Sequence, residues 1–183
     1  MKADFSPEQP NRVWCTGFTY MTLTNGTMRY HCSGIDLYDR SVVAGENSSF
    51  FTSSLAVRTL EKALSSAKAI PQNLILHSDQ GSQFASAEFV QHCRKLGISQ
   101  SMSRACCPYD NAPMERYYNP LKTELIYPYR FETAAEPVTI GTIRYAHTGI
   151  TDTGLRLKRE RSVALSSGVT KRLDHYKEYS APL

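Results

Sequence analysis

The sequence predicts a mixed α/β fold in which one central sheet is covered by helices on both faces. Two observations carry this prediction: an antiparallel hairpin comes first, and segments with helix and strand periodicity then alternate along the chain. The 183 residues have the length of one domain, and 41% of them are hydrophobic and 21% charged. These values are typical of a soluble globular core.

The first strands are expected at the start of the chain. Residues 13–24 (VWCTGFTYMTLT) are rich in aromatic and β-branched side chains, and Asn25-Gly26 after them is a strong signal for a hairpin turn. Residues 27–37 (TMRYHCSGIDL) return as the second strand, and residues 41–44 (SVVA) begin a third. The sheet therefore opens with antiparallel strands.

Helices and strands alternate in the next part. Helices are expected at residues 54–68, 87–96 and 111–126, where apolar side chains recur every three or four positions. Further strands are expected at residues 73–78 and 98–102. Because helices separate them, these later strands can run parallel to the first one, which completes a sheet of five strands.

The stretch ILHSDQGSQF, residues 75–84, brings a carboxylate to the exit of a buried strand. Apolar residues lead up to Asp79, and the turn signal Gln80-Gly81-Ser82 follows directly. An aspartate at the end of a strand often only forms a turn, so Asp79 by itself does not indicate chemistry.

The third helix belongs to the stretch PYDNAPMERYYNPLKTELI. Asp110 or Asn111 is expected to cap it, and Pro120 is expected to kink it. Glu115 lies near its start, with Lys122 two turns further along the same face. A single glutamate there is ordinarily a surface residue that interacts with the helix dipole.

Taken together, Asp79 and Glu115, with 35 residues between them, resemble the DDE transposases of two-reading-frame bacterial insertion sequences, relatives of retroviral integrases. The resemblance implies a ribonuclease H-like fold and a catalytic core for DNA integration and transposition, which joins transposon ends to target DNA. The residues that carry it are NRVWCTGFTY (11–20), IDLYDRSVV (35–43), LILHSDQGSQFAS (74–86), QSMSRACCPYDNAPMERYYNPLKTELI (100–126) and RFET (130–133).

The resemblance implies a metal site and a DNA interface. Asp79 and Glu115 would converge to roughly 4–8 Å and hold Mg²⁺ or Mn²⁺, two ions by family, because these cations prefer oxygen ligands and two of them clamp the attacking and leaving oxygens. Lys122, Arg104 and Arg116 would contact DNA phosphates. Transposon ends and target DNA would be the partners, bound by a homo-oligomer.

One departure from the family pattern concerns the first catalytic aspartate, which the family carries in a motif read as W-x-T-D-x-T-Y. Here the stretch is WCTGFTY, so Gly17 stands at that place and supplies no ligand. We expect weak metal binding and no strand transfer. If Asn25-Gly26 is a two-residue turn, Gly17 faces Gly34 and Asp36 lies diagonally on the same face, although a structural role for Asp36 is the preferred interpretation.

The expected organisation is an N-terminal extension at residues 1–12, the catalytic core at 13–133 and an atypical basic tail at 134–183. Family members carry helix-turn-helix segments before the core, and the family's helical tail is replaced here by a sequence without sustained periodicity. A frameshift near residue 134 or a divergent tail explains the change, and we expect poor order there. Basic residues after residue 153 account for the net charge of +4.

Composition narrows the cellular setting. Five cysteines without a CxxC pair predict reduced thiols, and no apolar stretch approaches the ~18 residues of a membrane span. We expect a cytoplasmic bacterial protein, associated with the nucleoid when it is on DNA. Three readings stay open: an inactivated transposase core that still binds DNA, a non-catalytic nucleic-acid- or protein-binding module with the same fold, and a nuclease that works with two carboxylates.

Overall fold

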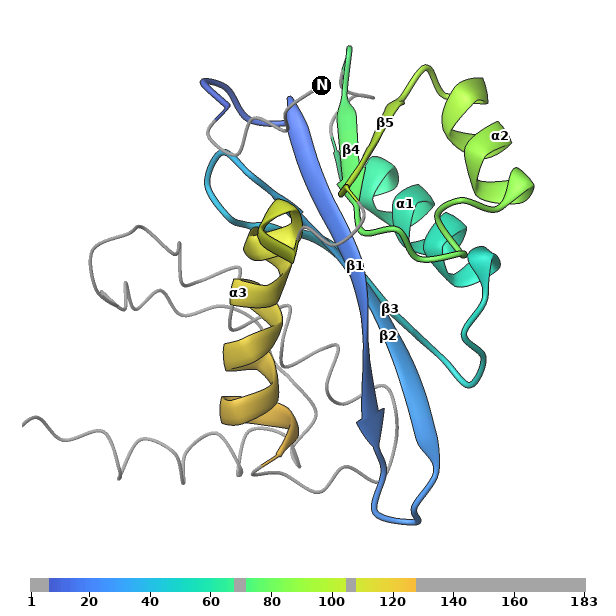
Figure 1. The fold of residues 1–183 in the computed structure, drawn as a ribbon, viewed down its shortest axis with the longest axis vertical. Coiled ribbons are helices and arrows are strands. Elements are labelled where there is room, and N and C mark those ends of the chain that lie inside the picture. Colours follow the sequence, from blue (N-terminus) through green and yellow to red (C-terminus); the bar gives the residue numbers. More distant parts are fainter. Residues whose placement is uncertain (1–6, 68–71, 105–107, 128–183) are drawn as a thin grey trace, which may run out of the picture.

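The computed structural model describes residues 7–67, 72–104 and 108–127, and these form the expected α/β architecture (Figure 1). A five-stranded sheet has the strand order β3-β2-β1-β4-β5. The strands are β1 (Val13–Thr22), β2 (Met28–Asp36), β3 (Val42–Ser48), β4 (Ile75–Ser78) and β5 (Ser99–Met102). The helices are α1 (Ser53–Ser66), α2 (Ala87–Lys95) and α3 (Ala112–Pro120), with a 3-10 turn η1 (Pro108–Asn111) before α3 and a π-helical segment η2 (Leu121–Ile126) after it.

The pairing of the strands is mixed, as predicted. β1 is antiparallel to β2 and parallel to β4, β2 is antiparallel to β3, and β4 is parallel to β5. The chain passes through α1 between β3 and β4 and through α2 between β4 and β5, because parallel neighbours need a crossover. β1 is therefore the central strand.

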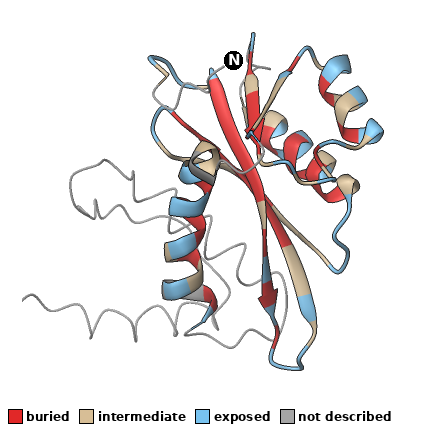
Figure 2. Ribbon diagram, viewed as in Figure 1, coloured by how far each residue is buried: buried red, intermediate tan, exposed pale blue. Residues whose placement is uncertain are grey.

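Alternate side chains of β1 enter two separate cores. Trp14 packs with residues of α1 and α2 on one face, whereas Cys15 packs with residues of α3 on the other. Figure 2 shows buried positions along β1 and on the inner sides of the three helices. Both faces of β1 are thus covered, which explains why its sequence lacks a simple apolar–polar alternation.

The hairpin between β1 and β2 differs from the expected one by one residue. Leu23 and Thr27 close the loop through the hydrogen bond from Leu23 N to Thr27 O, at 2.9 Å, and Gly26 adopts the left-handed φ of 77°. The loop therefore has three residues instead of two, a common hairpin form with glycine at the left-handed position. The predicted pairing of Gly17 with Gly34 is wrong, because Gly17 pairs with Ser33.

The corrected register moves Asp36 away from Gly17. Asp36 pairs with Trp14 and belongs to the face of the sheet opposite to that of Gly17, since a shift of one residue exchanges the faces. Its carboxylate accepts hydrogen bonds from the backbone N–H groups of Asn11, at 2.7 Å, and Tyr38, at 2.9 Å. Asp36 thus holds the ends of two loops and does not replace a carboxylate at position 17.

The start and the end of α3 also differ from simple helix rules. Asn111 is the N-cap residue, but its side chain makes no capping hydrogen bond and accepts instead from Cys15 Sγ at 3.3 Å. After Pro120 the helix continues as the π-helical η2, in which Tyr127 N donates to Lys122 O at 2.8 Å. The π-helical segment begins directly after Pro120, which lacks an N–H group.

Several expectations concern parts of the chain that are not described. The proposed tail, residues 134–183, and the RFET stretch at 130–133 lie outside the described residues. Among the helices that are described, none has the length and apolar character needed to cross a membrane.

Candidate active site beside β1 and β4

Asp79 directly follows β4 and forms the turn that its sequence context predicts. Its Oδ1 accepts a hydrogen bond from Gly81 N at 2.9 Å. A Cβ atom at position 81 would lie 2.9 Å from the same oxygen, so a side chain there would force the Asp79 carboxylate to shift. Asp79 is half-buried, and its other carboxylate oxygen, Oδ2, takes no part in the bond to Gly81.

Gly17 lies in β1, as predicted, on the face that α3 covers. The parallel pairing of β1 with β4 ends at Cys15 and His77, so Gly17 and Asp79 each follow the last pair by two residues. A Cβ atom at position 17 would lie 3.4 Å from Tyr118 Cε2 and 3.7 Å from Met114 Cε. A side chain at this position therefore points into the space between the strand exit and α3.

Tyr118 covers Gly17 from α3. Its hydroxyl group donates a hydrogen bond to Gly17 O and accepts one from Ser33 Oγ at 2.8 Å. The phenol is buried, and this burial raises its pKa well above the usual value, so the hydroxyl remains protonated. Nothing in the sequence indicates that the Tyr118 hydroxyl is bonded to β1.

Glu115 is exposed in the first turn of α3, next to the buried Met114. Helical periodicity puts Glu115 and Lys122 on one flank of the helix. The Lys122 ammonium lies 5.3 Å from the centre of the Tyr20 ring, a cation–π contact with the end of β1 beyond its pairing with β4. The separation between the carboxylates of Asp79 and Glu115 stays a prediction.

His77 is a buried residue that sequence reasoning did not select. Its Nε2 donates to Asp110 O at 2.7 Å, so Nδ1 is the acceptor for the Ser101 hydroxyl at 3.0 Å. Burial lowers the pKa of His77, which keeps the ring neutral. The available signal was a polar residue inside an otherwise apolar strand.

Arg104, one of the predicted DNA contacts, has a protein partner. Its Nε and Nη2 atoms donate to the Asp110 carboxylate at 3.0 and 3.2 Å, and its side chain is 70% exposed. These hydrogen bonds lower the pKa of Asp110 to about 2. Arg116 is exposed on α3, and Lys122 is half-exposed.

The expected arrangement of two metal ions does not fit the residues present. Among the residues that the structure describes, no group of three or more histidine, cysteine, aspartate or glutamate side chains could hold a metal ion. Gly17 supplies no carboxylate from β1. Asp79 and Glu115 still offer carboxylate oxygens, the ligands that Mg²⁺ prefers while it keeps several waters.

Comparison with known proteins reveals the family. The model of the integrase core domain family matches residues 7–108. The transposase for insertion sequence element IS904 of Lactococcus lactis subsp. lactis is 41% identical over 133 residues, which are 72% of this chain and 51% of that protein. Transposase InsF for insertion sequence IS3A of Escherichia coli K12 is 35% identical over 127 residues, 69% of this chain and 43% of that protein. The chain thus spans about half the length of these relatives.

Solved structures share the fold at low sequence identity. The chain matches the simian T-cell lymphotropic virus intasome in complex with PP2A regulatory subunit B56 gamma with a TM-score of 0.65 and 19% identity, over 88% of this chain and 62% of that one. It matches the dimeric HTLV-2 integrase catalytic core domain in complex with magnesium with a TM-score of 0.58 and 17% identity, over 79% and 90% of the two chains. The sheet with helices on both faces is therefore the ribonuclease H-like fold of these cores, and the chain belongs to the integrase core domain family.

Proposed function

We propose that this chain is the catalytic core of a DNA transposase that has lost its first catalytic carboxylate. In this proposal it binds DNA and a divalent cation but does not join DNA strands. The observation that carries the proposal is Gly17, which lies in β1 two residues beyond its last pair with β4, faces Tyr118 and Met114 of α3, and has no side-chain atom that could bind a metal ion.

The contacts of α3 support the approach of Glu115 to Asp79. The residues just before α3 contact His77 of β4 and Cys15 of β1, so the helix starts beside the strand from which Asp79 exits. Lys122, on the same flank as Glu115, contacts β1 beyond its pairing with β4. Both contacts favour a direction of Glu115 toward the β4 side of the helix.

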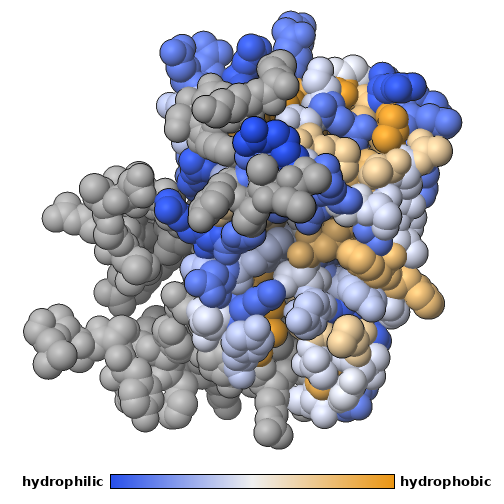
Figure 3. Space-filling model, in the orientation of Figure 1, coloured by the Kyte–Doolittle hydropathy of each residue, from blue (hydrophilic) through white to orange (hydrophobic). Residues whose placement is uncertain are grey.

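In the proposed site Asp79 and Glu115 hold one Mg²⁺ or Mn²⁺ ion. The cation supplies electrostatic stabilisation to a phosphate group, and the residues around it position the DNA backbone. Arg116, Lys122 and, beside its pair with Asp110, Arg104 are the proposed phosphate contacts. Strongly hydrophilic residues gather over the upper part of the molecule in Figure 3, where β4, β5 and the start of α3 lie.

A comparison of metal binding with DNA strand joining tests the proposal. Mn²⁺ titration of the unmodified chain is expected to show weak binding that Asp79→Asn or Glu115→Gln abolishes. Glu61→Gln, which removes an exposed carboxylate on α1 at the opposite face, serves as the matched control and leaves binding unchanged. Metal-dependent strand joining by the unmodified chain, or equal Mn²⁺ affinity in all four proteins, contradicts the proposal.

Gly17 also favours a second candidate, a non-catalytic binding module that keeps the fold for another purpose. If the module binds nucleic acid, it shares with the catalytic core a DNA affinity whose logarithm falls linearly with the logarithm of the salt concentration, because phosphate contacts release counterions. They differ in the effect of Gly17→Asp, which strengthens Mn²⁺ binding in an inactivated catalytic core. A module that binds another protein instead shows no salt-dependent affinity for DNA.

A further inference from the structure

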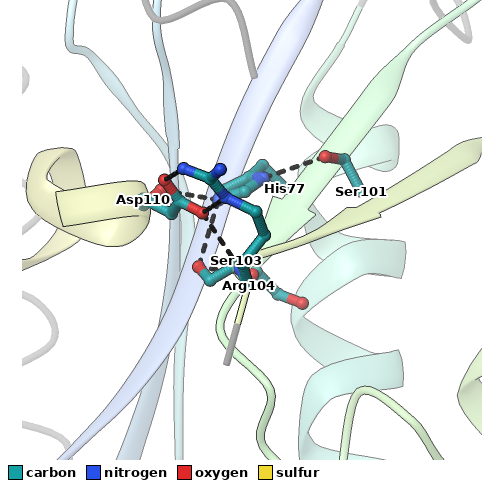
Figure 4. Close-up of polar contacts among 6 residues, drawn as sticks. His77, Ser101, Ser103, Arg104 and Asp110 are labelled. Atoms are coloured by element: carbon teal, nitrogen blue, oxygen red, sulfur yellow. Dashed lines mark hydrogen bonds and ion pairs between the residues drawn. The ribbon is translucent and has the colours of Figure 1, made fainter. Parts of the chain in front are cut away.

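A cluster of polar side chains joins β4, the end of β5 and the turn η1. Figure 4 shows its members: His77 from β4, Ser101 from β5, Ser103 and Arg104 just after β5, and Asp110 from η1. We call this cluster the Asp110 clamp. Neither the metal site nor the proposed phosphate contacts explain why one aspartate receives so many hydrogen bonds.

Asp110 is held through both its side chain and its backbone. Its carboxylate accepts from Arg104 N and Nε, each at 3.0 Å, and from Nη2 at 3.2 Å. Its carbonyl oxygen accepts from the buried imidazole of His77 at 2.7 Å. A bidentate arginine pair fixes direction as well as distance, so these bonds define the place of η1 relative to β4.

The helix that follows depends on this attachment. Asn111, the N-cap residue of α3, makes no side-chain hydrogen bond to the first turn of the helix. Tertiary contacts therefore hold the start of α3, and the clamp supplies the bond to β4. Ser103 strengthens the junction, because its backbone N–H and its hydroxyl both donate to Ser78 O, at 2.9 and 3.2 Å.

The clamp connects the supports of both carboxylates. Asp79 follows His77 by two residues, and Glu115 follows Asp110 by five, in the first turn of α3. We propose that Asp110 is a positioning residue that fixes the start of α3 against the exit of β4 and so sets the approach of Glu115 to Asp79. This inference rests on the proposed function for the role of the two carboxylates.

Two measurements on the unmodified chain and three variants test the inference. Arg104→Ala removes the guanidinium bonds, Asp110→Asn removes the charge but keeps the side-chain shape, and Arg104→Lys retains the charge without the fork. Glu46→Gln is the matched control, because it disrupts an exposed ion pair, with Lys62, on the other side of the sheet. Hydrogen exchange reports the stability of the first hydrogen-bonded amides of α3, at residues 115–119, and electron paramagnetic resonance of Mn²⁺ reports metal affinity.

We expect faster exchange at residues 115–119 in Arg104→Ala and Asp110→Asn and a loss of Mn²⁺ affinity of about tenfold, a size typical of residues that orient metal ligands. Arg104→Lys recovers part of both effects, and exchange in α2 and the melting temperature change little, because the Arg104 side chain is largely exposed. Unchanged exchange at residues 115–119, or faster exchange with unchanged Mn²⁺ affinity, overturns the inference. If the unmodified chain binds no Mn²⁺, the proposed function fails, whereas the exchange result still decides whether Asp110 fixes the start of α3.

Discussion

Replacement of Gly17 by aspartate adds a carboxylate on β1 beneath α3, in the metal site proposed above. The Cβ atom fits, because its nearest neighbours would be Tyr118 Cε2 at 3.4 Å and Met114 at 3.7 Å. The carboxylate, however, would extend beneath α3, where both of these side chains are buried. The same substitution is therefore expected to weaken the fold without metal and to strengthen metal binding.

The magnitude follows from burial and linkage. A polar group that is buried without a full set of partners costs about 1–3 kcal/mol in proteins, so Gly17→Asn is expected to be that much less stable than Gly17→Ala. Gly17→Asp has the same shape as Gly17→Asn and is expected to be less stable again, because a buried charge costs more than a buried amide. Mn²⁺ at about 100 times its dissociation constant raises the free energy of unfolding by about 2.7 kcal/mol, because it binds only the folded state. Gly17→Ala adds Cβ alone and is expected to be neutral or stabilising by about 0.5–1 kcal/mol.

Urea denaturation with and without Mn²⁺ measures these differences, and calorimetry measures the metal affinity directly. The reasoning requires that Mn²⁺ stabilises Gly17→Asp more than Gly17→Asn. If both variants unfold at the same urea concentration under both conditions, position 17 does not lie beside the carboxylates that bind the metal, and the assignment of the site is refuted.

Two further predictions concern buried groups around the site. Tyr118→Phe leaves the Gly17 carbonyl oxygen without its donor and is expected to lower the free energy of unfolding by about 1–3 kcal/mol. The control Tyr38→Phe, at a half-exposed ring, is expected to change this free energy little in the same urea assay. Equal effects of the two substitutions would contradict the hydrogen bond. Burial lowers the pKa values of His31 and His77 below 6.5, so the unfolded chain binds more protons than the folded chain in this range. The free energy of unfolding is therefore expected to fall as pH decreases through 6.5 toward the folded-state pKa values. Urea midpoints between about pH 5 and 7.5 measure this dependence, and a flat profile would contradict it.

Much of the fold was predictable from local sequence. The strands, the helices and their order were confirmed, because apolar periodicity and turn residues act over a few neighbouring positions. The hairpin register was not, since Asn25-Gly26 is compatible with loops of two or three residues. The one additional residue in the loop shifts the register and places Asp36 on the face of the sheet opposite to Gly17.

By itself, the sequence determined the family pattern, the carboxylate after β4 and the absence of a carboxylate at position 17, because each of these is a matter of residue identity in a short motif. Only the tertiary structure decided that Tyr118 binds Gly17 O and that His77 and Arg104 both hold Asp110. These contacts join residues that are 6 to 101 positions apart. Local propensity carries no information about such partners, which are chosen when α3 packs on the sheet and buried polar groups must find hydrogen bonds.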